Sequence, residues 1–172
     1  MLAVAKGFSQ LPENKMIWQE ESLTWDDFKG APEPENLFDA NTNSGISYSW
    51  SLRSSEMQTD FLFNVKTYFY PDLSWVKPDK ISRELLSHEQ LHFDITELHA
   101  RKLKKAMEDY KLPEQHKIKR ELEKIYRDVE FSRKQMQERY DRETDHSQNY
   151  QAQKKWKAFI NSELKKLDAF SD

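Results

Sequence analysis

The segment HEQLH, residues 88–92, contains two histidines four positions apart and a glutamate directly after the first histidine. On a helix, side chains four positions apart project from one face about one turn apart, so His88 and His92 can converge on one metal ion. Imidazole nitrogens bind zinc at about 2.0–2.1 Å. Glu89 completes the H-E-x-x-H pattern, in which the carboxylate lies beside the metal and takes a proton from its bound water. The segment therefore predicts a zinc site with His88 and His92 as ligands and Glu89 as the catalytic base.

The pattern alone has a plain alternative, which is a solvated helix face that happens to be rich in histidine. A shuffled chain of this composition would contain it on the order of once in a hundred times, so the pattern by itself does not decide. A buried imidazole pair needs a partner, and a metal ion is one. Burial of this helix against a sheet is predicted by five apolar residues around the motif: Leu85, Leu86, Leu91, Ile95 and Leu98.

A catalytic zinc ion takes three protein ligands and keeps one position open for water. The extended motif with a third histidine is absent, because Ile95 and Leu98 occupy its glycine and histidine positions. His99 shares the stripe of His88 and His92, but it lies about 10.5 Å beyond His92 along a helix axis. We therefore interpret His99 as a pocket or packing residue.

We choose His146 as the third zinc ligand. It lies in the polar stretch YDRETDHSQNY between two predicted helices, where a side chain can reach across to another element, and Asp145 beside it can help to position it. A carboxylate such as Glu108 or Glu121 is the competing ligand. His116, in PEQHK, opens a charged helix and is interpreted as solvated.

Four further residues are candidates for supporting roles at or near the predicted site. Glu84, one turn before His88, can act as an acceptor that orients its ring, or it can be exposed to solvent. Glu97 is placed to pair with Arg101 at i,i+4 and is interpreted as structural. Tyr140 and Tyr150, which flank His146 in the sequence, are candidate donors to an oxyanion, although a tyrosine of this kind is more often a core residue.

Two segments before the motif alternate as strands do. ISYSWSL places Ile46, Tyr48, Trp50 and Leu52 on one face, and DFLFNVKTYFY alternates in the same way. Their short separation favours an antiparallel pair. The first 35 residues are predicted to be irregular, with Trp25 and Phe28 as apolar anchors.

From about Ile81 the period becomes helical, interrupted only by KLPEQ and DHSQN, which are predicted inter-helix loops. Between these loops an apolar stripe in steps of three and four indicates packing within the domain rather than pairing with another chain. The last helix has a core face at Trp156, Phe159, Ile160, Leu164 and Leu167. The pattern predicts an α+β fold, with a small N-terminal antiparallel sheet followed by about three long helices.

The composition limits the classes of protein that remain. The chain has 172 residues, which favours a single domain over 1–172, with residues 1–22 as an irregular N-terminal segment. It has a net charge of −3, with basic and acidic residues interleaved, so we expect no nucleic-acid partner. There are no cysteines for disulfides or thiolate metal sites, and no apolar run approaches the ~20 residues of a membrane span. The start, MLAVAKGFSQ, is too short and polar for a secretory signal, which fits a cytoplasmic protein or a chain that begins after a removed signal.

Four segments carry a resemblance to a known family: LTWDDFKG, SGISYSW, SWVKPDKISRELLSHEQLHFDITELHARKL and YDRETDHSQN. The sequence resembles a bacterial family of uncharacterised domains described as predicted secreted zinc-dependent proteases. The resemblance covers about Leu23 to Asn149. It implies a zincin-like metallopeptidase fold, zinc at the histidine pair, and a secreted or periplasmic location.

The same matching carries the family's TDH segment over to Thr144, Asp145 and His146, which supports the choice of His146. Many relatives are expected to have a glycine after this histidine, whereas this chain has Ser147. The resemblance thus implies a zinc peptidase acting on polypeptides. Two alternatives stay open: a non-enzymatic helical interaction module whose metal is structural or absent, and a zinc amidase that acts on a non-peptide amide. The oligomeric state is unknown.

Overall fold

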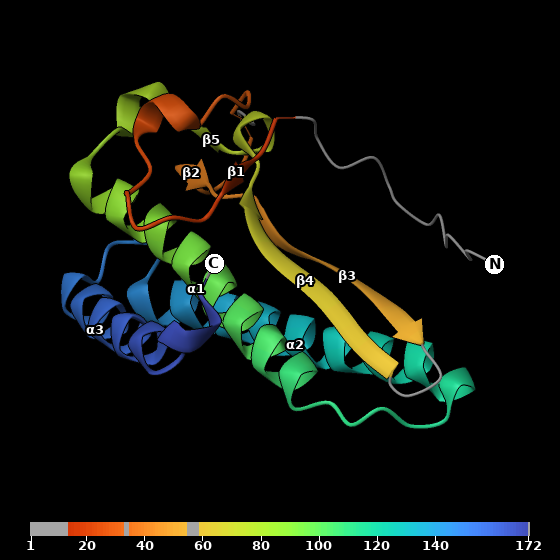
Figure 1. Ribbon diagram of the computed structural model, residues 1–172. Helices are drawn as coiled ribbons and strands as arrows, with labels where there is room; N and C mark the ends of the chain where they lie inside the picture. The colour runs from red at the N-terminus through yellow and green to blue at the C-terminus, as the bar shows by residue number, and fades with distance from the viewer. Residues whose placement is uncertain (1–13, 33–34, 55–58, 172) are drawn as a thin grey trace.

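The computed structural model describes residues 14–32, 35–54 and 59–171, and the structural statements below refer to these residues. The fold is α+β, as predicted, with two small antiparallel sheets and three helices (Figure 1). The first sheet has the strand order β1-β4-β3, formed by β1 (Met16–Ile17), β4 (Thr59–Phe69) and β3 (Ser44–Ser54). The second pairs β2 (Ala40–Asn41) with β5 (Trp75–Val76).

The predicted antiparallel pair is the long β3–β4 hairpin. Its register runs from Ser44 opposite Phe69 to Ser54 opposite Thr59. The alternation predicted from the sequence gives the hairpin one apolar face, on which Ile46 and Val65 are buried. This face covers α1 and the first half of α2, so the sheet is fixed to the helices by side-chain burial.

The helices are α1 (Arg83–Glu108), α2 (Gln115–Thr144) and α3 (Tyr150–Lys166). Ser82 caps α1 by accepting a hydrogen bond from the backbone N–H of Leu85, and Asn149 caps α3 in the same way. Both predicted loops are confirmed, since 109–114 and 145–149 separate the helices. None of the helices in the described part of the chain has the length and apolarity needed to cross a bilayer.

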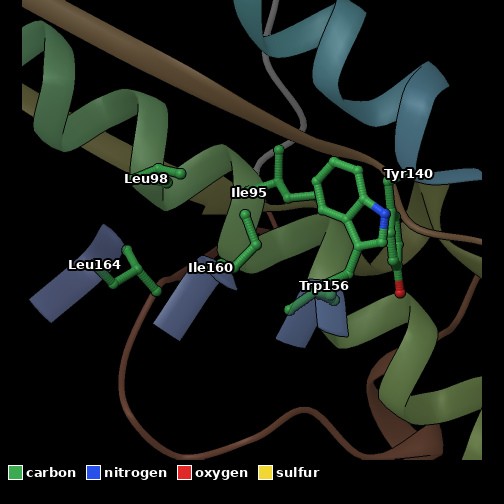
Figure 2. Close-up of a cluster of buried hydrophobic side chains, with 7 residues drawn as sticks. Ile95, Leu98, Tyr140, Trp156, Ile160 and Leu164 are labelled. Carbon is green, nitrogen blue, oxygen red and sulfur yellow. The ribbon is translucent and has the colours of Figure 1, made fainter. Parts of the chain in front are cut away.

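Helix α1 is enclosed on several sides, which corrects one prediction. Leu86 packs in the cluster that contains Phe69 of β4, as predicted, and Ala100, Leu103 and Met107 contact the hairpin farther along α1. Leu91, Ile95 and Leu98, which were predicted to face the sheet, instead form a core with Tyr140 of α2 and with three residues of α3: Trp156, Ile160 and Leu164. Figure 2 shows Ile95 and Leu98 of α1 facing the labelled residues of α3. The motif helix is thus the central element of the domain.

The apolar stripe of α2 lies inside the domain, as the sequence indicated. Ile118, Leu122 and Tyr140 are buried, and Ser132 in the middle of the stripe is exposed. The core face predicted for the last helix is confirmed except at Phe159, which is exposed.

The predicted Glu97–Arg101 pair is confirmed and is buried. Arg101 Nε donates to Glu97 Oε1 at 2.8 Å, and Arg101 Nη1 donates to the backbone carbonyl of Leu164 at 3.0 Å. The pair therefore satisfies a carbonyl near the end of α3 and ties this helix to α1. Its role is structural, as expected.

His99 is a packing residue, in agreement with its interpretation from the sequence. Its side chain is buried, and its Nδ1 donates to the carbonyl of Ile95 at 2.8 Å. Burial lowers the pKa of His99 to about 4, and the backbone hydrogen bond offsets this only in part.

We predict that His99 makes the stability of the fold depend on pH. An unfolded histidine has a pKa of about 6.5, so between about pH 6.5 and pH 4 the unfolded chain binds a proton that the folded chain does not. The free energy of unfolding should therefore decrease as the pH is lowered from about 6.5 to about 4, by about 3 kcal/mol in all. Urea unfolding in the presence of EDTA measures this slope. His99→Gln should flatten it, whereas the exposed His116→Gln should leave it unchanged; equal slopes for all three proteins would refute the assignment.

Candidate metal centre

Two side chains of α1 and one of α2 converge on a single point. His88 Nε2 and His92 Nε2 lie 3.2 Å apart, and Asp141 Oδ1 lies 3.2 Å from the first and 2.8 Å from the second. Around a tetrahedral zinc ion with bonds of about 2.0–2.1 Å, ligand atoms are about 3.3 Å apart. The triangle of donor atoms therefore has nearly the size that one zinc ion requires.

Glutamines from two other helices fix the orientation of both rings. His88 Nδ1 donates to Gln153 Oε1 at 3.2 Å, and His92 Nδ1 donates to Gln137 Oε1. Each amide nitrogen in turn donates to a backbone carbonyl, Gln153 to Ser87 and Gln137 to His92, which defines the amide orientation. Because an amide oxygen only accepts, Nδ1 carries the hydrogen and Nε2 is the atom free to bind a metal.

The close approach of these side chains shifts the pKa values of His92 and Asp141. Burial lowers the pKa of His92, but the hydrogen bond with Asp141 and the negative charges of Glu89 and Asp141 outweigh burial and raise it above the usual value. Burial likewise raises the pKa of Asp141, but the hydrogen bonds from both rings hold it well below its usual range. A proton on the Nε2 atom of His92 competes with a metal ion for the same lone pair, so metal binding weakens as the pH falls.

Glu89 is a buried carboxylate next to this point. Its side chain is 4% exposed, and no donor among the described residues contacts its Oε2. Burying an unpartnered charge is costly, so this oxygen fits a centre that holds a cation and water. Glu89 and Asp141 together carry two negative charges, which one divalent cation balances. Thr42 Oγ1 donates to the backbone carbonyl of Glu89 at 3.1 Å and fixes the adjacent segment to α1.

The centre opens into a cavity of about 570 Å³. Its lining includes His88, His92, Asp141 and Glu89 from the helices, and the segment 37–42, which contains β2. Arg133 and Gln137 of α2 also line it. The donor atoms are therefore accessible to a molecule of substrate size.

His146 lies on the wall of the same cavity, but it is not part of the convergent group, which comprises His88, His92 and Asp141 among the described residues. Its exposed ring contacts Phe38, with 4.7 Å between ring centroids. The place that the sequence analysis gave to His146 is filled in this group by Asp141. Zinc ligation by His146 stays a prediction.

The competing carboxylates are not brought to the centre. Glu108 is exposed at the end of α1, and Glu121 accepts a hydrogen bond from the hydroxyl of Tyr110 at 3.0 Å. Glu84 is exposed, and Gln153 is the residue that orients the ring of His88. His116 is exposed, as expected.

The two candidate tyrosines also lie away from the cavity lining. Tyr140 is fully buried, and its hydroxyl donates to Gln153 Oε1 at 2.7 Å. Burial raises the pKa of Tyr140, so it stays a hydrogen-bond donor within the core. Tyr150 is exposed and lines a different pocket.

The sequence analysis missed three residues of the centre: Asp141, Gln137 and Gln153. Gln137 and Asp141 are four apart on α2, each directly after an apolar position of the stripe (Met136 and Tyr140). A polar pair at that spacing was the one available signal, and it is weak in a chain with 30 acidic residues.

The comparisons with known proteins give a family but no activity. The family model described as "Bacterial protein of unknown function (DUF922)" matches residues 27–147, more than two thirds of the chain, including the whole of α1 and Asp141. Neither a curated protein nor a solved structure gives a significant match. The chain therefore belongs to the DUF922 family of bacterial proteins of unknown function.

Proposed function

We propose that this protein is a zinc-dependent metallopeptidase with a zincin-like arrangement of its site. His88, His92 and Asp141 are the zinc ligands, and Glu89 is the catalytic base. The single observation that carries the proposal is the convergence of three atoms able to bind a metal beside a buried carboxylate oxygen that has no hydrogen-bond partner in the described part of the chain. The tautomer set by Gln137 and Gln153 supports it, because both Nε2 atoms face the same point.

The chemistry of peptide hydrolysis can be assigned to these residues. A divalent cation held there supplies a Lewis acid and lowers the pKa of water. Glu89 takes a proton from the attacking water while the water oxygen forms a bond to the carbonyl carbon. The π electron pair of the carbonyl group moves onto the carbonyl oxygen. Glu89 then gives that proton to the leaving nitrogen as the C–N bond breaks and the carbonyl re-forms in a carboxylic acid, which afterwards loses its proton to solvent as the carboxylate product. Its burial next to the cavity suits both transfers.

A polypeptide substrate is favoured by the wall formed by residues 37–42. In the described chain β2 has β5 as its one strand partner, and residues 39–42 line the cavity. An extended peptide can pair with an edge strand through backbone groups alone. Leu37 and Phe38 present exposed apolar side chains at the same wall, which suits an apolar side chain of a substrate.

The rival functions are weaker on specific grounds. Two histidines and one carboxylate also suit Fe(II) oxygenases, but Glu89 beside them is the base that hydrolysis needs. An interaction module would use the apolar stripe of α2, whose residues Ile118, Leu122 and Tyr140 are buried inside the domain. An amidase acting on a non-peptide amide would use the same site, and substrate profiling separates it from a peptidase.

The ligand set predicts which variants lose zinc. His88→Ala and Asp141→Asn should each weaken zinc binding by about 100-fold or more, since even residues that only orient a ligand contribute 10–100-fold. His146→Ala should bind zinc as the wild type does, and the exposed His116→Ala is the matched control. Competition with a chromophoric chelator gives the affinity, and elemental analysis gives the identity of the metal. Loss of zinc in His146→Ala with retention in Asp141→Asn would make His146 the third ligand.

The role of Glu89 predicts a separation of metal binding from catalysis. Glu89→Gln should retain zinc and lower the hydrolysis rate of a fluorogenic peptide library by about 100- to 10,000-fold, because the amide cannot take the proton of water. Glu84→Gln changes an exposed glutamate on the same helix and should be fully active. A zinc-loaded wild type that hydrolyses no peptide, or a fully active Glu89→Gln, would contradict the proposed peptidase.

A further inference from the structure

The turn between α2 and α3 has a strained backbone. Asp145, His146 and Ser147 have φ values of 48°, 49° and 76°, and none of them is glycine. The left-handed region is disfavoured for residues with a Cβ atom, and three such residues in a row are unusual. Strain of this kind persists only where the surroundings impose it, and it concentrates at functional sites. The proposed zinc ligands His88, His92 and Asp141 do not account for this strained turn.

Hydrogen bonds tie this turn to the third ligand of the centre. The backbone N–H groups of Asp145 and His146 both donate to the carbonyl of Asp141, the second at 3.1 Å. The N–H of Asn149 donates to the carbonyl of Thr144 at 2.7 Å and closes the turn. These hydrogen bonds hold the backbone of His146 in a fixed relation to Asp141, and the residue lies on the wall of the same cavity.

The residues assigned so far do not meet one requirement of peptide hydrolysis. The carbonyl oxygen of the scissile bond needs a hydrogen-bond donor as it becomes negative. Most side-chain donors that line the cavity already have a partner: Asn41 with Leu73, Thr42 with Glu89, Ser44 with Thr96, Arg133 with Glu130, and Gln137 with His92. The rings of His88 and His92 donate to Gln153 and Gln137, so His146 and Gln148 are the lining side-chain donors that have no side-chain hydrogen bond among the described residues. Both side chains are exposed, but the ring of His146 packs against Phe38, which restricts its position.

We propose that His146 is a catalytic residue, whose ring N–H donates a hydrogen bond to the carbonyl oxygen of the scissile bond as that oxygen takes up the π electron pair. This inference rests on the proposed peptidase function and gives His146 a role other than metal ligation. His146 transfers no proton in the step: the proton of water goes to Glu89 and then to the leaving nitrogen. The hydrogen bond strengthens as charge develops, so it lowers the barrier more than it tightens substrate binding.

The strained turn supplies an unusual test, because glycine relieves the strain that histidine carries. His146→Gly should unfold at the same temperature as the wild type or higher, and yet lower kcat by about 100- to 1,000-fold, with KM changed by less than about 3-fold. His146→Asn tolerates the left-handed backbone and retains an N–H donor, so it should recover part of the rate. Ser147→Gly is the matched control: it relieves strain in the same turn, retains the imidazole and should be fully active.

Two readouts other than turnover complete the experiment on the full, zinc-loaded chain. Zinc content and affinity of His146→Gly should equal those of the wild type, measured as for the ligand variants. A phosphonate analogue of the best-cleaved library peptide, which presents tetrahedral anionic oxygens, should bind His146→Gly more weakly by a factor similar to the loss in kcat/KM.

Each other outcome overturns the inference in a recognisable way. Loss of zinc from His146→Gly would make the residue a ligand. Full activity of that variant, or a loss of rate in Gln148→Ala in its place, would remove the oxyanion role from His146 while leaving the peptidase intact. A zinc-loaded wild type that cleaves no library peptide would overturn the proposed function, and the role of His146 with it.

Discussion

The packing of Tyr140 is the interaction on which the rest of the structure depends. Its ring stacks on His88 with 4.6 Å between centroids, and it meets the edges of His92 and Trp156 at 4.9 and 5.4 Å. Its hydroxyl donates to Gln153, the residue that orients His88. Figure 2 shows Tyr140 at the end of the apolar core between α1 and α3. One side chain thus joins the core that holds the helices together to the rings that form the metal centre, so the rings are held by close packing as well as by hydrogen bonds.

Because the centre draws on all three helices, it exists only in the folded chain. Its candidate ligands come from α1 and α2, and the glutamines that orient them come from α2 and α3. A site of this kind is absent in the unfolded state, so the free energy of binding a metal ion there would add to that of folding. The same folding buries the carboxylate of Glu89 with no donor to Oε2 among the described residues, which costs stability. A divalent cation at the candidate centre would offset that cost.

The sequence predicted the long hairpin, the three helices and most of their packing, but it did not predict the two-residue strands β1, β2 and β5, of which β1 lies in the stretch expected to be irregular. Alternation located β3 and β4, two polar breaks separated the helices, and the i,i+4 spacing of Glu97 and Arg101 gave their ion pair. These features depend on local periodicity, which a single sequence displays. The prediction that Leu91, Ile95 and Leu98 face the sheet was wrong, because α1 has apolar residues on several faces. A periodicity tells which residues are buried but not which neighbouring element buries them.

The same limit decides what could be predicted of the site. One helical turn sets the separation of His88 and His92, so the sequence sufficed to bring their Nε2 atoms together. The third donor depends on where α2 crosses α1, and that crossing is set by core residues such as Tyr140 and Trp156. A loop histidine was the natural choice, since loops often carry functional side chains. Yet the left-handed turn that places His146 begins only after α2 has already presented Asp141 to the pair, one helical turn before the helix ends. The carboxylate on the rigid element therefore has the geometric advantage as a candidate ligand, and the histidine on the turn lies on the wall of the cavity.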